Sequence, residues 1–202
     1  NPTVEYYKIV MNNQTLERNT WLLLQEAAVK FHRMKTLVLG IGNTLLTDEG
    51  VGVHVLLALE PELGHLPDVT LLDGGTLSFT LAGPIEEADA LIVVDAANIK
   101  SKPGEWALLQ GEEMDAFLMS NRKATVHEVG LTDLRAIAIL AGHWPEKRAM
   151  LAIQPDVVDW GEHPTPAVAA AISPACTAIR ELIREWHVPE IQSLGADHCQ
   201  RD

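Results

Sequence analysis

Short apolar runs alternate along this chain with segments whose apolar residues recur every three or four positions. The apolar runs predict strands at residues 37–41, 69–73, 90–95, 105–109 and 149–153, and the periodic segments predict helices at residues 51–59, 77–87, 112–119, 131–141 and 166–186. This alternation is typical of an α/β fold with a mostly parallel sheet. The strand at 105–109 is expected at an edge, with an antiparallel direction left open, and Pro174 is expected to kink or split the last helix.

Residues 37–52 are the most informative stretch, because they predict a strand, a tight turn and the start of a helix. The apolar run is of the kind that is buried on both faces of a parallel sheet. Gly40 and Gly42 let the chain turn sharply after this strand. Gly50 and Gly52 remove side-chain bulk where the first helical turn would lie against the sheet. These glycines therefore predict close packing or a functional site at this end of the strand.

A glycine turn between a strand and a helix also occurs in nucleotide-binding proteins, but this turn lacks their other features. Leu45 stands where a dinucleotide site has its third glycine, and no Lys-Ser/Thr pair follows as in a P-loop. The carboxylates of Asp48 and Glu49 would repel a phosphate at the helix start. A nucleotide-binding enzyme is therefore disfavoured. Thr47 or Asp48 can cap the helix. A carboxylate here suits a cation or a proton transfer, and the simpler alternative is that Asp48 and Glu49 only cap the helix.

The composition is that of an acidic globular protein. The chain has 202 residues, of which 47% are hydrophobic, and this is enough to bury a full core. Fifteen basic and 28 acidic residues give a formal charge of −13, which argues against nucleic acid or an anionic membrane as a partner. No apolar run reaches the about 20 residues of a membrane span, so no membrane insertion is expected. Cys176 and Cys199 stand far apart, without the spacing of metal ligands or of a disulfide framework. This is expected of a protein in the reducing cytoplasm.

The ends of the chain set the predicted domain boundaries. The first strand begins just after Met34, so residues 34–187 are expected to form a single α/β domain. Residues 1–33 are assigned to an N-terminal extension of unknown role, for which upstream read-through is one origin. Residues 188–202, which include Pro189 and Gly195 among scattered polar residues, are expected to be a loose tail.

Four polar residues stand where strands end or a helix begins. Glu49 follows the first strand, Asp73 ends the second and Asp95 ends the third, and His127 lies in a loop before the helix at 131–141. If these strands are parallel, the four residues meet at one edge of the sheet. Two carboxylates and one imidazole, from Glu49, Asp95 and His127, suit a divalent metal shared with a substrate. Leu131 replaces the second histidine of a His-Glu-x-x-His metalloprotease motif. The simpler alternatives are a loop cap, a helix cap and an Asx-turn.

Four segments together resemble the nickel-iron hydrogenase maturation endopeptidases in order and spacing. They are Gly40-Ile-Gly-Asn-Thr-Leu-Leu-Thr-Asp-Glu-Gly-Val-Gly52, Asp73-Gly-Gly-Thr76, Leu91-Ile-Val-Val-Asp-Ala96 and His127-Glu-Val-Gly-Leu131. Asp95 follows Glu49 by 46 residues, and His127 follows Asp95 by 32 residues. The resemblance extends from Met34 to about Trp186. The Asp-Gly-Gly-Thr form is similar to that of the enzymes that serve uptake-type hydrogenases.

The resemblance implies an endopeptidase that removes the C-terminal extension of the hydrogenase large-subunit precursor after nickel insertion, by cutting after a His or Arg. It implies a three-layer α/β/α sandwich of the phosphorylase/hydrolase-like type, with about five strands. Glu49, Asp95 and His127 would bind nickel supplied by the precursor, and with Asp73 they are the candidate catalytic residues. An aspartic-type and a metallo-type mechanism both remain open, and a monomer is compatible with the sequence. The alternative is a non-catalytic nickel-site checkpoint or metal-binding module on the same scaffold.

Overall fold

The structure is a computed structural model that describes residues 34–76, 79–120 and 126–187 of the chain. Within these ranges the side chains of Phe79 and of residues 126–130 are not described. The predictions for residues 1–33 and 188–202 lie outside the described residues.

A five-stranded, mostly parallel sheet forms the centre of the domain. Its strands are β1 (Thr36–Ile41), β2 (Val69–Gly75), β3 (Ala90–Ala96), β4 (Trp106–Gln110) and β5 (Lys147–Ile153). They lie in the order β2-β1-β3-β5-β4. β1 pairs in parallel with β2 and β3, β3 pairs in parallel with β5, and only the β4–β5 pair is antiparallel. The predicted sheet is confirmed, and the direction of the fourth strand is now fixed as antiparallel at an edge.

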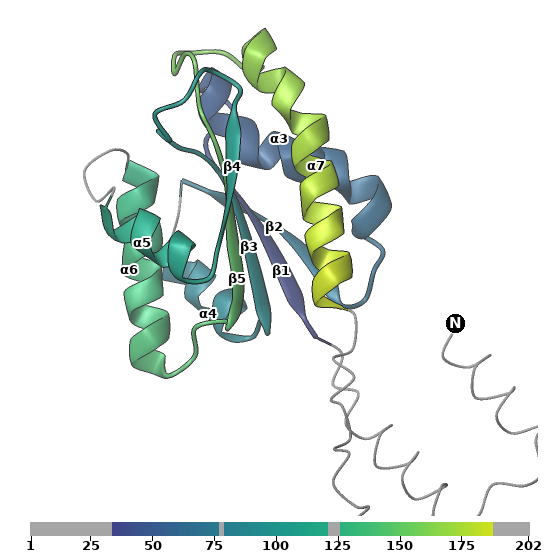
Figure 1. Cartoon of the computed structure of the whole chain (residues 1–202), viewed down its shortest axis with the longest axis vertical. Helices are drawn as coiled ribbons and strands as arrows, with labels where there is room; N and C mark the ends of the chain where they lie inside the picture. The colour runs from purple at the N-terminus through teal and green to yellow at the C-terminus, as the bar shows by residue number, and fades with distance from the viewer. Residues whose placement is uncertain (1–33, 77–78, 121–125, 188–202) are drawn as a thin grey trace, which may run out of the picture. The chain divides into compact units, whose positions relative to one another are not determined.

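Helices cover both faces of the sheet, as the three-layer prediction required (Figure 1). The helical segments are η1 (Thr47–Gly50), α3 (Val51–Leu63), η2 (Phe79–Leu81), α4 (Ala82–Glu86), α5 (Glu112–Ser120), α6 (Val126–Ala141) and α7 (Pro166–Trp186). Figure 1 shows α3 and α7 on one face and α4, α5 and α6 on the other. The α/β/α sandwich is therefore confirmed.

The two faces of the sheet contribute to separate apolar cores, because successive strand residues point to opposite faces. Val38 of β1 belongs to the core beneath α3 and α7, whereas its neighbour Leu39 belongs to the core beneath α4, α5 and α6. Ile92 and Val93 of β3 divide in the same way. Strands that must fill both cores have no polar face, which explains the uninterrupted apolar runs in the sequence.

Helix α7 runs without a break from Pro166 to Trp186 and contains Pro174 in its interior. The expectation that Pro174 splits this helix is therefore wrong. Among the described helices, α7 alone has the length and hydropathy of a membrane span. Its side chains Ile179 and Ile183 are nevertheless buried in the core against the sheet. This packing explains its apolar composition without a membrane.

Helix α6 starts earlier than predicted. It begins at Val126, about one turn before Leu131, so the backbone of His127 lies in the first turn of the helix and not in a preceding loop. Three side chains of α6 are buried in the core on this face of the sheet and fix the position of the helix. They are Leu131, Leu134 and Ala138. This packing outweighs the low helix propensity of the valines and the glycine near the start of α6. Because of that low propensity, the sequence did not indicate where the helix begins.

Candidate functional site

A buried carboxylate lies at the carboxyl end of the central strand β3. Every residue of β3 is buried, and Asp95, the last but one, is only 1% exposed. Asp95 stands opposite Ala152 of the neighbouring strand β5. Taking a carboxylate out of water costs free energy, so such groups are rare except where they are needed. The end of a central parallel strand is also where open α/β sheets bind ligands.

Glycines bring the segment that contains Glu49 onto the end of β3. Gly42 has a φ of 132°, and a Cβ at this position would overlap the carbonyl oxygen of Glu49. A Cβ on Gly52 would overlap the carbonyl oxygen of Val94, the residue before Asp95. The 3₁₀ helix η1, which carries Glu49, accordingly contacts β3. The close packing predicted from the glycines is confirmed.

Asp48 binds a distant loop and does not cap the helix. Its Oδ2 accepts hydrogen bonds from the N–H groups of Asp156 and Val157, both at 2.9 Å, and from the Thr165 hydroxyl at 3.0 Å. Its Oδ1 accepts the Thr165 N–H at 2.6 Å. No side-chain hydrogen bond caps η1 or α3, so the prediction that Thr47 or Asp48 caps the helix is wrong. The fully buried Asp48 instead fixes the loop after β5 beside η1.

Further hydrogen bonds join the same loop to the turn before η1. The Thr47 N–H donates to the carbonyl oxygen of Gly161 at 2.7 Å, and the Gly161 N–H donates to the carbonyl oxygen of Leu45 at 2.9 Å. The Thr47 hydroxyl donates to the carbonyl oxygen of Val157 at 2.7 Å. Two segments that are far apart in sequence thus form one rigid frame next to Glu49. The sequence analysis did not identify this loop as part of the site.

Asp73 lies at the same end of the sheet but in a different environment. It is an exposed residue of β2, opposite Gly40 of β1. Its Oδ1 accepts a hydrogen bond from the Gly75 N–H at 2.8 Å, which is the Asx-turn considered as the simpler alternative. Asp73 is therefore held in a turn, whereas Asp95 is buried within the sheet.

His127 is placed by its backbone at the start of α6, but its side chain lies outside the described residues. Among the side chains that the structure describes, no three His, Cys, Asp or Glu residues gather as metal ligands. Glu49 and Asp95 would supply two oxygen donors of the predicted set, and the imidazole would be the third donor. Two carboxylates and one imidazole suit a borderline divalent ion such as nickel.

His54 is a half-buried residue of α3 close to the loop that Asp48 holds. Burial lowers the pKa of His54, and the nearby His163 of that loop lowers it further. Its Nε2 is buried and has no hydrogen-bond partner among the described residues. The neutral form of His54 is therefore favoured, which limits positive charge at the end of the sheet where Glu49 and Asp95 lie.

The sequence is similar to proteins of one family. The HycI model, which describes hydrogenase maturation proteases, matches residues 53–182. The chain is 39% identical over 160 residues to the hydrogenase 2 maturation protease of Escherichia coli K12, across 78% of this chain and 96% of that protein. This chain belongs to the hydrogenase maturation protease family. It is also 38% identical to the hydrogenase expression/formation protein HupD of Rhodobacter capsulatus, across 78% of this chain and 75% of that protein.

Solved structures of the maturation proteases share the fold. The hydrogenase maturating endopeptidase HybD from Escherichia coli is similar with a TM-score of 0.71 and 36% identity, over 76% of this chain and 94% of that chain. The [NiFe] hydrogenase maturation protease HybD from Thermococcus kodakarensis is similar with a TM-score of 0.61 and 27% identity, over 74% of this chain and 99% of that chain. The chain is therefore a hydrolase of the maturation protease type with the α/β architecture of that family.

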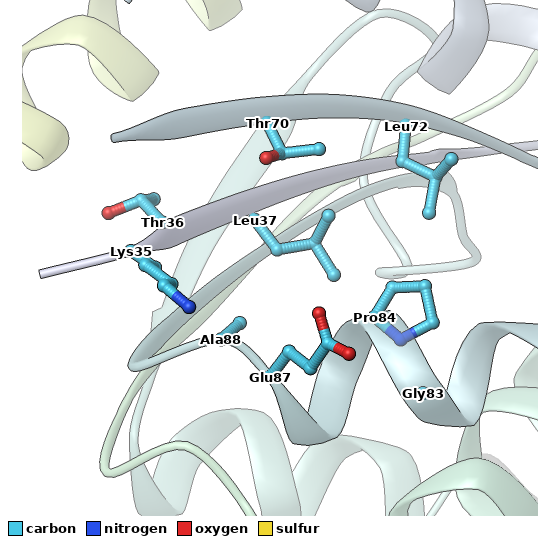
Figure 2. Close-up of a pocket in the computed structure, with 9 residues that line it drawn as sticks. All are labelled: Lys35, Thr36, Leu37, Thr70, Leu72, Gly83, Pro84, Glu87 and Ala88. Atoms are coloured by element: carbon cyan, nitrogen blue, oxygen red, sulfur yellow. The ribbon is translucent and has the colours of Figure 1, made fainter. Parts of the chain in front are cut away.

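One cavity of the maturation protease lies away from these candidate residues, at the amino end of the sheet. Its volume is about 340 Å³, and it opens between α4 and the strands β1 and β2. Figure 2 shows Leu37 and Leu72 of the strands above Pro84 of α4, with Lys35 and Glu87 at one side. None of the four predicted site residues lines this cavity. The candidate site is thus defined by strand ends and not by this cavity.

Proposed function

We propose that this protease removes the C-terminal extension of a nickel-iron hydrogenase large-subunit precursor after nickel insertion, by cutting after a His or Arg near the metal-binding cysteine motif. The supporting observation is that η1, which carries Glu49, contacts β3, the strand whose carboxyl end holds the buried Asp95. Carboxylates held at the end of a parallel sheet can bind a cation or accept a proton from water. Membership of the maturation protease family supports peptide hydrolysis as the reaction.

Nickel enters this proposal as part of the substrate. In the precursor, cysteine thiolates hold the ion, and they are softer ligands than carboxylates. Oxygen atoms of Glu49 and Asp95 and a ring nitrogen of His127 would therefore add ligands to the ion without removing it from the thiolates. Contact through the ion would fix the scissile bond beside the protease, which lowers the entropic part of the barrier by up to about several kcal/mol. Only a nickel-loaded precursor would then be cut.

Hydrolysis of the scissile bond requires an activated water. Glu49, Asp73 and Asp95 are the candidate general bases of an aspartic-type mechanism, and polarisation by the substrate's nickel would give a metallo-type mechanism. The burial of Asp95 favours it over Asp73, because a buried carboxylate acts on a proton without competition from bulk water. We assign Asp73 a smaller role, since one of its oxygens already accepts the Gly75 N–H.

The proposed role of His127 sets the direction of the pH dependence. An imidazole binds metal only in its neutral form, because protonation removes the lone pair that binds the ion. Processing should therefore fall as the pH drops through the titration of His127. Full activity with a protonated His127 would contradict the proposed ligation.

The proposal includes a monomer that acts in the cytoplasm. The two cysteines of the sequence, Cys176 and Cys199, do not have the spacing of a disulfide framework, which suits a reducing compartment. The formal charge of −13 disfavours contact with nucleic acid or anionic lipid. Light scattering of the purified protein tests the monomer, and fractionation of cells tests the compartment.

Single substitutions at the three proposed nickel ligands test the function. Purified Glu49→Gln, Asp95→Asn and His127→Ala variants are incubated with nickel-loaded and nickel-free precursor, and the products are read by mass. Each substitution is expected to lower the processing rate by about 100-fold or more, because the lost group holds the ion or activates the water. Asp73→Asn is expected to have a smaller effect.

Glu86→Gln is the matched control, because Glu86 is an exposed residue of α4. It should process the loaded precursor at the wild-type rate. If all three ligand variants also process at that rate, the site assignment is wrong. If the wild-type protein binds the precursor but leaves its extension intact, the non-catalytic checkpoint replaces the protease.

A further inference from the structure

Four exposed apolar side chains lie on two loops beside the candidate site. They are Leu45, from the turn before η1, and Val157, Val158 and Trp160, from the loop after β5. Trp160 is 80% exposed, so most of a large aromatic side chain is in contact with water. Single apolar residues on a surface need no explanation, but a group that includes a tryptophan is typical of a protein-binding surface. We call these four residues the apolar patch.

The apolar patch rests on a fixed backbone. The turn that carries Leu45 and the loop that carries Trp160 are joined by hydrogen bonds through Gly161, which donates to one residue of the turn and accepts from another. The Asp159 N–H also donates to the Thr47 hydroxyl oxygen at 3.1 Å. Because the two loops are already ordered, a partner would not have to order them on binding. A preformed surface therefore binds with a smaller entropic penalty.

The apolar patch is also continuous with the candidate site. The carboxylate of Asp48 accepts the N–H of Val157 at 2.9 Å, and Glu49 is the next residue along the chain. A protein segment bound on the patch would consequently lie next to Glu49.

Acidic residues alternate with the apolar residues of the loop. Asp156, Asp159 and Glu162 are all exposed, on either side of Val157, Val158 and Trp160. Apolar side chains bordered by carboxylates complement a segment that presents apolar side chains together with a basic side chain. The formal charge of −13 for the whole chain favours the same kind of partner.

We propose that the apolar patch is the docking surface for the hydrogenase large-subunit precursor, and that it binds a precursor segment with apolar side chains and at least one basic side chain. This inference rests on the proposed function for the identity of the partner. Trp160 is the principal contact, and the frame held by Asp48 and Thr47 directs the bound segment toward Glu49. The patch acts in binding and not in hydrolysis.

The test separates binding from the chemical step. KM and kcat for nickel-loaded precursor, and the Kd of the precursor, are measured for wild-type protein and for Trp160→Ser and Val158→Ser. Trp160→Ser should raise KM and Kd about tenfold or more, because an exposed aromatic contact often dominates an interface, and kcat at saturating precursor should not change. Trp160→Phe should restore most of the affinity. Added salt should weaken binding, because the flanking carboxylates attract the partner.

Leu140→Ser is the matched control, because Leu140 is 87% exposed on α6 and is not part of the patch. It should leave KM, Kd and kcat unchanged. All variants should unfold at the wild-type temperature, which excludes a folding defect.

An unchanged Kd for both Trp160→Ser and Val158→Ser overturns the docking surface while leaving proteolysis intact. A dimer of wild-type protein that Trp160→Ser dissolves also overturns it, because the occupant would then be a second copy of the chain. A precursor that binds in a Trp160-dependent manner but is not cut supports the docking surface and refutes the proposed function.

Discussion

The two ends of the five-stranded sheet are packed in different ways. At the carboxyl end, the first turn of α3 lies so close to the strands that a Cβ on Gly52 would overlap the carbonyl oxygens of Ile41 and Val94. At the amino end, a cavity of about 340 Å³ opens between α4 and the strands, and a Cβ on Gly83 would meet no atom within 4 Å. Gly52 at one end has no room for a methyl group, and a cavity opens beside α4 at the other end.

The two ends also hold their carboxylates differently. The carboxylate of Asp115, near the amino end of β5, forms salt bridges with Arg148 at 2.7 Å and Arg135 at 3.0 Å. The buried carboxylate of Asp48, near the carboxyl end, accepts hydrogen bonds from three N–H groups and one hydroxyl. Those donors are neutral, so they stabilise the negative charge of Asp48 without cancelling it.

This difference indicates where the chemistry belongs. A site that must hold a cation benefits from carboxylates whose positions are fixed before the ion arrives, because no reorganisation is then needed during the reaction. Close backbone contacts and neutral donors at the carboxyl end provide such fixed positions. The amino end instead holds Asp115 in salt bridges with two arginines, and the cavity there is lined by Lys35 and Glu87 of opposite charge. The predictions below test this contrast.

The largest effect is expected from Asp48→Ala. This change leaves the N–H groups of Asp156, Val157 and Thr165 without their acceptor and opens a void in a buried place. We expect the free energy of unfolding to fall by about 3–5 kcal/mol, because three half-buried backbone donors lose a buried, charged partner at once. Urea denaturation measures the loss. Hydrogen exchange should become faster in the loop at residues 155–165.

Asp89→Ala is the matched control at the amino end. The Asp89 carboxylate accepts a hydrogen bond from the Lys35 N–H at 2.7 Å. Its replacement should lower the free energy of unfolding by about 1 kcal/mol and leave processing unchanged. Equal losses for the two variants would contradict the view that the carboxyl end depends on Asp48.

A smaller loss is expected from Gly52→Ala. The added methyl group would collide with backbone atoms of β1 and β3, which cannot move aside as a flexible side chain can. Displacement of α3 should lower the free energy of unfolding by about 2–3 kcal/mol. Because η1 precedes α3 directly, Glu49 should move away from β3, and processing should fall by more than the loss of folded protein explains.

Gly83→Ala is the same substitution at the amino end, and the opposite sign is expected. Gly83 lies in α4, where a methyl group meets nothing. Alanine restricts the unfolded chain and favours the helix, so this variant should be more stable by about 0.5–1 kcal/mol. Thermal unfolding of the two variants gives the comparison directly. A destabilised Gly83→Ala protein would show that the amino end is as tightly packed as the carboxyl end.

Short apolar runs were sufficient to predict the central strands, because β1, β3 and most of β5 are buried on both faces of the sheet. The glycines after β1 were sufficient to predict close packing at its carboxyl end. The start of α6 was mispredicted because local propensity there opposes a helix that packing stabilises.

The frame around the candidate site could not be predicted from the sequence. Asp48 precedes Glu49, and both carboxylates stand at a helix start, so a cap was the local explanation for Asp48. Its true partners lie more than one hundred residues later in the chain. Hydrogen bonds between such distant segments leave no periodic signal, and neither does the exposed Trp160 that they position. Glu49 and Asp95 could be identified from the sequence because apolar runs predict the two strands at whose carboxyl ends they stand.

The last effect concerns the neutralised carboxylate at the amino end, and it depends on pH. Burial raises the pKa of Asp115, but hydrogen bonds and charges from Arg148 and Arg135 outweigh this and hold the pKa below its ordinary value. The unfolded protein therefore binds the proton more readily than the folded protein does. The resulting stability is present above about pH 4, the usual pKa of aspartate, and is lost as the pH falls through the folded pKa.

Asp115→Asn should accordingly lower the free energy of unfolding by about 1–2 kcal/mol at pH 7, since the pair is only partly buried. At a pH below the folded pKa of Asp115 the variant and the wild-type protein should be equally stable, because the wild-type carboxyl group is then neutral as well. Urea denaturation at successive pH values measures the difference, and Glu112→Gln, an exposed residue of the same helix, is the control. Processing at pH 7 should be unchanged by Asp115→Asn. A loss of processing would mean that the two ends of the sheet are coupled, and that arginine-neutralised carboxylates at the amino end contribute to the geometry of Glu49 and Asp95.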